Sequence, residues 1–252
     1  MSGTDLRGRR VLLTGASSGI GAVTCRALVA AGASVAMVAR RKERLEALEV
    51  DLGERAIAVA ADVTDSVALA AAVHRAAERL GGLDTVVTVA GRAMAGGMVT
   101  GDPQTWRALF ELNLLAPLAT VRYAYPYFSS EGRRDIVVVA SAAALTPLPT
   151  AGVYGASKRG LLAACETLRL EVAADGVSVG VVIPGMFETE GLTLEGIVID
   201  GDVPVNDFPL FAPDTLPGPP EVVADTIVFM LGLPQGTAIN QVVIRPTGEF
   251  TP

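Results

Sequence analysis

Three residues in the second half of the chain have the types and spacing of an acid–base group. Tyr154 and Lys158 are four residues apart, so on a helix their side chains lie on the same face. A free tyrosine has a pKa of about 10, and we expect the lysine charge to lower that pKa toward the range that proton transfer to an alkoxide requires. Ser141 follows an apolar run over residues 136–140, where its hydroxyl can hold a substrate oxygen beside the phenol. The alternative is a surface tyrosine and lysine with an unrelated loop serine.

A glycine-rich segment near the N-terminus has the spacing of a dinucleotide-binding loop. Residues 14–21 connect a short apolar run to a stretch with helical periodicity. Gly15 permits a sharp turn, Gly19 lets backbone N–H groups approach a pyrophosphate, and Gly21 lets the helix pack closely on a sheet. The N-terminus of that helix then attracts an anion. A glycine-rich turn without a ligand is the alternative, and the lack of a following Gly-Lys-Ser/Thr argues against a phosphate-hydrolysing P-loop.

The end of the second predicted strand indicates which dinucleotide binds. NAD sites usually place an acid there to bind the ribose 2′-hydroxyl, whereas a 2′-phosphate requires positive charge. This chain has Arg40 and Arg41 at that point and no acid before Glu43. We therefore expect a preference for NADP(H), with Ser17 adding a hydroxyl contact to the same phosphate. The alternative is that both arginines only begin a charged helix.

The apolar pattern alternates between short runs rich in β-branched residues and longer amphipathic stretches. Continuous apolar strands separated by helices indicate a parallel sheet buried on both faces. We predict an α/β, doubly wound Rossmann fold of about seven strands in the order 3-2-1-4-5-6-7, formed by a single domain over residues 1–252. One helix is expected to run from Asp102 and Pro103 to Tyr127. Strands are predicted over residues 11–13, 34–39, 56–60, 85–89, 135–140, 177–183 and 241–245.

Residues 186–220, which we call the lid segment, interrupt this pattern with six prolines, seven acids and no basic residue. A long irregular stretch inside a compact domain is usually a lid or a binding loop. Because its acids would repel an anion, we expect an uncharged, small to medium and moderately apolar ketone or secondary alcohol as substrate. The alternative is that the acids only keep a mobile loop soluble. Phe187 and Leu192 are the expected substrate-binding residues, and the other candidate wall residues are Leu194, Ile197, Val198, Ile199, Phe208, Leu210 and Phe211.

The composition argues against several classes of protein. Half of the 252 residues are hydrophobic and 19% are charged, which favours a continuous core over disorder. The net charge of −7 argues against a nucleic-acid partner, and no apolar run approaches the roughly 18 residues of a membrane span. Cys25 and Cys165 lack metal-site spacing and His74 is expected at the surface, so no metal is predicted. A cytoplasmic location is the default expectation.

Together these motifs resemble the short-chain dehydrogenase/reductase family over residues 9–244. The order and spacing of the motifs carry the resemblance, including the step from Ser141 to Tyr154. One position departs from the family pattern, because the usual Asn-Ala-Gly after the fourth strand is Val89-Ala90-Gly91 here. An amide that normally ties adjacent backbone near the cofactor is therefore missing. Besides the glycine loop, the matching residues are Asp62, Val63, Asn113, Ser141, Tyr154, Lys158, Pro184, Gly185 and Thr189.

The resemblance implies a role for each matching residue. Tyr154 would be the acid–base catalyst, with Ser141, Lys158 and Asn113 completing the catalytic set. Asn113 would organise a water in the proton relay, and Lys158 would also hold the nicotinamide ribose. By analogy with the family, a homodimer or homotetramer is expected. The residues expected to contact NADP(H) are Gly15, Ser17, Ser18, Gly19, Ile20, Gly21, Arg40, Arg41, the adenine-binding Asp62 and Val63, Ala90, Gly91, Tyr154, Lys158, and Pro184, Gly185 and Thr189 beside the nicotinamide.

Two rival functions fit the same fold. The first is a regulatory sensor that holds NADP(H) with little turnover, for which Val89 is the only support. The second is a dehydratase or epimerase with a tightly held cofactor. Arg133 and Arg134 are expected in a solvated turn, with a docking patch for an acidic carrier protein as the alternative. The intact Ser-Tyr-Lys-Asn set argues against the sensor, whereas net oxidation of NADPH with a ketone would exclude both rivals.

Overall fold

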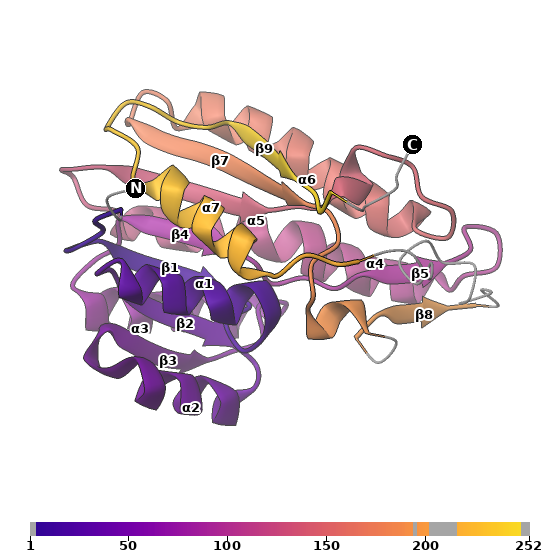
Figure 1. The fold of residues 1–252 in the computed structure, drawn as a ribbon, viewed down its shortest axis with the longest axis horizontal. Helices are drawn as coiled ribbons and strands as arrows, with labels where there is room; N and C mark the ends of the chain where they lie inside the picture. The colour runs from indigo at the N-terminus through magenta and orange to yellow at the C-terminus, as the bar shows by residue number, and fades with distance from the viewer. Residues whose placement is uncertain (1–3, 194–195, 202–215, 248–252) are drawn as a thin grey trace.

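A computed structural model of the chain describes residues 4–193, 196–201 and 216–247. Its main feature is a seven-stranded sheet in which every pair of neighbouring strands is parallel (Figure 1). In spatial order its strands are β3 (Ala56–Ala60), β2 (Ser34–Ala39), β1 (Arg10–Thr14), β4 (Thr85–Thr88), β6 (Arg134–Val139), β7 (Val177–Pro184) and β9 (Gln241–Ile244).

This arrangement confirms the predicted doubly wound fold and the predicted order of the seven strands. The labels β5 and β8 belong to a separate strand pair, so the sheet strands in sequence order are 3-2-1-4-5-6-7 as expected. The order reverses between β1 and β4, since β2 follows β1 on one side and β4 adds on the other. Ligand sites in doubly wound sheets lie at the carboxyl ends of the strands at this switch point.

Side chains of the sheet alternate between two apolar cores. In β1, Leu12 packs in one core while Val11 and Leu13 pack in the other, and all three are fully buried. Both cysteines, Cys25 and Cys165, are buried and unpaired within these cores. The two-sided burial explains why the strands read as continuous apolar runs rather than as alternating ones.

Helices cover both faces of the sheet (Figure 1). Residues of α1 (Gly19–Ala30), α2 (Lys42–Leu52) and α7 (Glu221–Leu231) pack in the core that contains Leu13. Residues of α3 (Ser66–Leu80), α5 (Ala116–Ala124) and α6 (Gly152–Glu171) pack in the core that contains Leu12. Within the described part of the chain, no helix is long and apolar enough to cross a bilayer.

The prediction of a single helix from Asp102 to Tyr127 is wrong in the middle of that range. The start is as predicted, because the Asp102 side chain accepts a hydrogen bond from the N–H of Gln104 and Pro103 opens α4 (Pro103–Phe110). A π-helical turn, η2 (Glu111–Leu115), then separates α4 from α5. The turn holds Asn113, whose buried side chain bonds the backbone of another loop. A tertiary contact of this kind leaves no periodicity in the sequence.

The lid segment contains structure that the sequence did not predict. A short 3₁₀ helix, η5 (Glu190–Leu192), is followed by β8 (Val198–Asp200), which pairs in parallel with β5 (Met94–Gly96). Asp200 anchors this pair, since its carboxylate accepts from Trp106 Nε1 at 2.8 Å and from the Asp102 N–H at 2.9 Å. The expected wall residues Leu194, Phe208, Leu210 and Phe211 lie outside the described residues.

The prediction that Arg133 and Arg134 form a solvated turn is wrong. Arg133 makes two bonds to Asp135 and donates to the Leu233 and Pro234 carbonyls, which fastens β6 to the end of α7. Its side chain is only 11% exposed. Arg134 donates to the carbonyl of Asp175. Because both guanidiniums are occupied within the fold, the pair offers no patch for an acidic carrier protein.

Candidate active site

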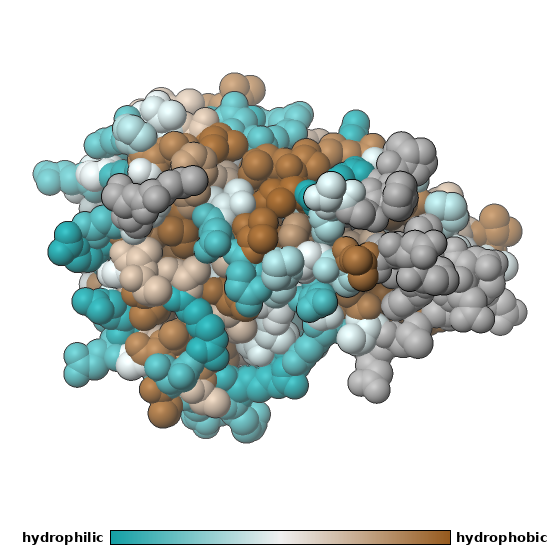
Figure 2. Space-filling view, in the orientation of Figure 1, coloured by the Kyte–Doolittle hydropathy of each residue, from teal (hydrophilic) through white to brown (hydrophobic). Residues whose placement is uncertain are grey.

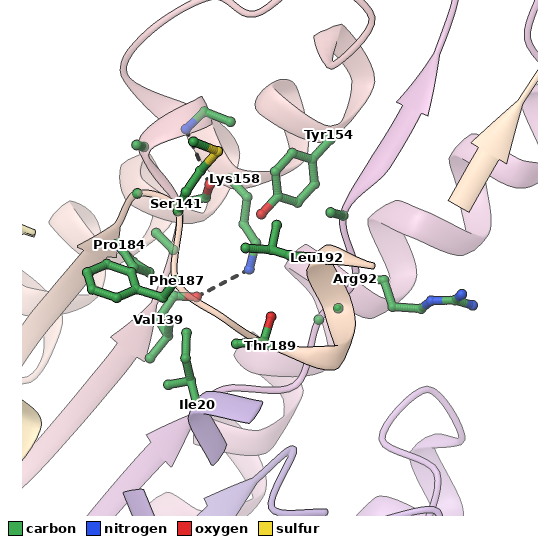
Figure 3. Close-up of a pocket in the computed structure, with 18 of the residues that line it drawn as sticks. Ile20, Arg92, Val139, Ser141, Tyr154, Lys158, Pro184, Phe187, Thr189 and Leu192 are labelled. Atoms are coloured by element: carbon green, nitrogen blue, oxygen red, sulfur yellow. Dashed lines mark hydrogen bonds between the residues drawn. The ribbon is translucent and has the colours of Figure 1, made fainter. Parts of the chain in front are cut away.

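A pocket of about 180 Å³ lies at the carboxyl edge of the sheet, where β4, β6 and β7 end. Figure 3 shows side chains from the first half of α6, from the loop after β7 and from the start of α1 converging on it. Its lining is mostly apolar. The pocket gathers ten of the residues expected from the sequence: Ile20, Gly91, Ser141, Tyr154, Lys158, Pro184, Gly185, Phe187, Thr189 and Leu192.

The side chains of Tyr154 and Lys158 extend from the first turns of α6 into this pocket (Figure 3). Lys158 is 4% exposed, and its ammonium donates to the Val139 carbonyl at 3.2 Å. Burial lowers the pKa of Lys158 to about 8. A buried cation at the end of β6 can therefore stabilise negative charge on a bound molecule and lose its proton close to physiological pH.

The expectation that Lys158 lowers the pKa of Tyr154 is wrong for this structure. Burial raises the pKa of Tyr154, and the opposing effect comes from a hydrogen bond with Ser141. The lysine ammonium instead points to the Val139 carbonyl (Figure 3). Burial thus disfavours the phenolate form of Tyr154, which favours its action as a proton donor.

Ser141 sits at the start of a short 3₁₀ helix, η4 (Ala142–Ala144), directly after β6. Its hydroxyl accepts a hydrogen bond from the N–H of Ala143 at 3.3 Å, which caps that helix. The same hydroxyl interacts with the phenol of Tyr154. The serine is therefore fixed on its backbone side and faces the phenol, and an oxygen placed between the two groups would contact both.

Asn113 is fully buried behind the pocket rather than in its lining. Its Oδ1 accepts from the Arg92 N–H at 2.9 Å, and its Nδ2 donates to the Arg92 carbonyl at 2.9 Å and to Ser157 Oγ at 3.3 Å. The amide thus clamps the loop that follows β4 onto α6. It holds backbone at the same loop where Val89 replaces the usual asparagine. The expected water relay through Asn113 stays a prediction.

Gly91 lies where this clamp meets the lysine, and a side chain there would press on both groups. A Cβ atom on Gly91 would lie 3.0 Å from Asn113 Oδ1 and 3.2 Å from Lys158 Nζ. We expect Gly91→Ala to lower kcat on the order of tenfold, because small displacements of catalytic groups are costly. Gly160→Ala in α6 is the matched control, since its Cβ would meet Leu114 at an ordinary 3.4 Å. Steady-state kinetics of the two variants should differ, and equal kcat values would contradict the close approach at Gly91.

The glycine loop has the shape that a dinucleotide requires. Gly15 has a φ of +80°, and a Cβ there would lie 2.6 Å from the Ala90 nitrogen. A Cβ on Gly21 would lie 2.0 Å from the Gly15 carbonyl oxygen. Ser18 precedes α1 but makes no side-chain cap, so the first N–H groups of the helix are available to a phosphate. These features fit a bound pyrophosphate.

The two arginines expected to bind a 2′-phosphate differ in their contacts. Arg41 reaches back over the glycine loop and donates to Ser17 Oγ at 3.1 Å and to Ser18 Oγ at 2.5 Å. Arg40 is 3.7 Å from Asp62, whose carboxylate also accepts from the backbone and hydroxyl of Thr64. The predicted adenine contact Val63 is 8% exposed and packs mainly in the core. Arg41 is therefore the arginine that the structure brings to the glycine loop.

Sequence reasoning missed part of the pocket wall and one arginine. Leu148 and Ala151 lie between Ser141 and Tyr154 in the chain. Because a segment that joins two residues of one site has to pass close to that site, their position in the sequence could have identified both as lining residues. Arg44, one helical turn after Arg40, had no signal of its own, because its partner is in the lid segment. The missed lining residues are Val89, Arg92, Ala93, Met94, Val139, Ala140, Ala142, Ala143, Leu148, Ala151, Met186 and Gly191.

A doubly wound sheet with this loop and this pocket defines an oxidoreductase of the Rossmann type. The chain matches the family model described as short chain dehydrogenase over residues 9–195, and it belongs to that family. Glycine betaine reductase ATRR of Emericella nidulans is 33% identical over 97% of this chain, which spans only 19% of that longer protein. An uncharacterized oxidoreductase of Staphylococcus epidermidis is 28% identical over 93% of this chain and 96% of its own length.

Solved structures with similar folds contain either nicotinamide cofactor. A short chain dehydrogenase of Burkholderia cenocepacia in complex with NADP is 30% identical, with a TM-score of 0.81, and the match covers 95% of this chain and 97% of that one. The 3-ketoacyl-(acyl-carrier-protein) reductase of Brucella melitensis complexed with NADH is 25% identical, with a TM-score of 0.84 and coverage of 98% and 100%. Family membership alone therefore does not select the cofactor.

Proposed function

We propose that this protein transfers a hydride between NADP(H) and a ketone or secondary alcohol, with Tyr154 as the acid–base catalyst. The observation that supports this most strongly is the convergence of Ser141, Tyr154 and Lys158 in one apolar pocket beside the glycine loop. Residues 1–252 are proposed to act as one catalytic domain.

Each side chain has a distinct part in the proposed reduction. Bound NADPH supplies the hydride. Ser141 donates a hydrogen bond to the carbonyl oxygen, and Tyr154 transfers its phenolic proton to that oxygen as negative charge develops there. Lys158 is proposed to hold positive charge near the phenol and to bind the nicotinamide ribose. Asn113 acts as a positioning residue, because its hydrogen bonds hold the Arg92 backbone beside this group.

The preference for NADP(H) over NAD(H) rests on charge at the end of β2. The chain has Arg40 and Arg41 there, and Arg41 already contacts both serines of the glycine loop. A guanidinium held in this way suits a 2′-phosphate, whereas the acid that would bind a 2′-hydroxyl is missing from the end of the strand. Asp62, Val63, Ala90, Gly91, Pro184, Gly185 and Thr189 are proposed to line the rest of the cofactor.

The substrate is proposed to be uncharged and moderately apolar. The apolar walls that support this include Phe187 and Leu192, both of which line the pocket. Two acids of the lid segment do not support it, because Glu190 is paired with arginines, Asp200 is buried against Trp106, and neither lines the pocket. Glu195, Asp202, Asp207 and Asp214 lie outside the described residues. Within the described part of the chain, the apolar walls carry the substrate proposal.

An NADPH-oxidation screen over neutral, carboxylated and amino ketones tests the proposal. We expect stoichiometric NADPH consumption with neutral ketones, at a kcat/KM on the order of tenfold above that for carboxylated analogues, because an apolar pocket does not repay the desolvation of a charge. NADPH should be preferred over NADH. NADPH binding without turnover would favour the sensor, and product formation without net oxidation would favour a dehydratase or epimerase.

We further propose that the chain forms a homodimer or homotetramer. Apolar side chains gather over α7 and the neighbouring strands on the face shown in Figure 2. The exposed apolar residues of α7 include Phe229 at 56% and Val222 at 41%. Exposed aromatic and aliphatic side chains gathered on one face are typical of a subunit interface. Light scattering should give the mass of two or four chains, and a monomer at micromolar concentration would refute this.

A further inference from the structure

Glu190, the first residue of η5, forms ion pairs with two arginines, Arg41 and Arg44, on the side of the site where the cofactor is proposed to bind. Its Oε2 is 2.9 Å from Arg41 Nη1, and its Oε1 is 2.5 Å from Arg44 Nη1. The same Arg41 guanidinium donates to Ser17 and Ser18 of the glycine loop. A carboxylate of the lid segment thus binds two guanidiniums, one of which also bonds the two hydroxyls of the glycine loop. Both arginines hold the pKa of Glu190 below its usual value, so it is ionised at neutral pH.

The residues beside Glu190 lie directly against the glycine loop. A Cβ atom built on Gly19 would lie 3.1 Å from the Cβ of Thr189, which places this part of the lid segment over the point where backbone N–H groups face a pyrophosphate. Two residues further along η5, Leu192 lines the substrate pocket. The segment from Thr189 to Leu192 therefore touches the cofactor site at one end and the substrate pocket at the other.

We propose that Glu190 is an internal competitor for the 2′-phosphate of NADP(H), and that Arg44 is a further ligand of that phosphate. This inference rests on the proposed preference for NADP(H). A phosphate has nearly two negative charges and three acceptor oxygens, whereas the carboxylate has one charge and two oxygens. The phosphate therefore displaces Glu190 from Arg41 and Arg44, while a cofactor without it leaves the ion pairs in place.

Exposure of the three side chains makes this exchange easy. Glu190, Arg41 and Arg44 are 54%, 43% and 48% exposed, so their ion pairs are partly screened by water and individually weak. Displacement frees the first residue of η5, and η5 also carries Leu192 of the substrate pocket. The 2′-phosphate thus has two effects: it distinguishes NADP(H) from NAD(H), and it removes the ion pairs that hold Glu190 of the lid segment in place.

Calorimetry tests the proposal by measuring how tightly the full-length protein binds two nucleotides, adenosine 2′,5′-bisphosphate and adenosine 5′-monophosphate. Glu190→Gln should tighten binding of the bisphosphate by about 2- to 10-fold, the range expected for the loss of exposed ion pairs, and leave the monophosphate unchanged. Glu188→Gln is the matched control, because it removes the same charge from an exposed position two residues away. Arg44→Met should weaken the bisphosphate only. All of these differences should shrink at high salt.

Three outcomes separate the inference from the proposed function. If the unaltered protein binds both nucleotides equally, the preference for NADP(H) fails. If it prefers the bisphosphate but Glu190→Gln and Glu188→Gln behave alike, only the competition fails. Hydrogen exchange gives an independent readout: the amides of residues 189–193 should exchange faster with the bisphosphate bound than with the monophosphate, and equal rates would overturn the release of the lid segment.

Discussion

Tyr154→Phe is expected to lower kcat by about 10²- to 10⁴-fold, the usual contribution of a positioned proton donor. Removal of the hydroxyl leaves the ring, which packs against the small clusters around Ala95 and Met94, so the fold should be unaffected. NADPH affinity should change by less than about tenfold, the value of one neutral hydrogen bond. Steady-state kinetics with a neutral ketone, together with fluorescence titration of NADPH, measure both quantities.

Tyr125→Phe is the control for this variant. It removes the same hydroxyl from a tyrosine whose partner is Asp175, away from the pocket. We expect its kcat to stay within about twofold of the unaltered enzyme, as is usual for a surface substitution. A Tyr154→Phe variant that keeps full activity would show that another group delivers the proton, and it would overturn the assignment of Tyr154.

The sheet was predictable because each strand is specified by residues that are close together in the sequence. Each strand is an apolar run bounded by a helix, and parallel strands with helical crossovers leave few topologies to choose from. The catalytic residues were predictable for a related reason. Ser141 follows the end of β6 and Tyr154 lies in the first turn of α6, so both had to lie at the carboxyl edge of the sheet. Their convergence in one pocket follows from that topology.

The parts that could not be predicted depend on contacts between distant segments. The pairing of β5 with β8 joins strands of only three residues, which are too short for a periodic signal. Glu190 binds Arg41 and Arg44 across almost 150 positions of sequence. The raised pKa of Tyr154 depends on its burial, and the Lys158 ammonium points to the Val139 carbonyl. Spacing along a helix places two side chains on one face, but it does not decide where the charged end points.

Lys158→Met is expected to remove activity and to stabilise the fold at the same time. Burial lowers the pKa of Lys158 from an ordinary 10.5 to about 8, so at pH 7 its charge destabilises the folded state by about 3 kcal/mol. Methionine has a similar length and no charge. Loss of the hydrogen bond to the Val139 carbonyl offsets about 1 kcal/mol of the gain, which leaves a rise in Tm of about 5 °C. The kcat/KM should fall by at least about 10²-fold without the cation.

The stabilising effect has a definite pH dependence. Between about 8 and 10.5 the unfolded chain holds the Lys158 proton while the folded chain has lost it, so the unaltered protein gains stability as pH rises through this window. Below pH 8 both states are protonated and the charge destabilises the fold to its full extent. The difference in Tm between Lys158→Met and the unaltered protein should therefore be constant below about pH 8 and shrink toward pH 10.5, where the lost hydrogen bond leaves the variant slightly less stable than the unaltered protein.

Lys42→Met provides the control, because Lys42 is 66% exposed on α2, where it pairs with Glu46 at 3.5 Å. Its Tm should show no gain at pH 7 and no closing difference at high pH, since an exposed ammonium is solvated in both states. If Lys158→Met were less stable than the unaltered protein at pH 7, the buried ammonium would contribute to the stability of the fold rather than reduce it. The same cation would then be a structural residue, and the loss of activity in the variant would no longer identify its catalytic part.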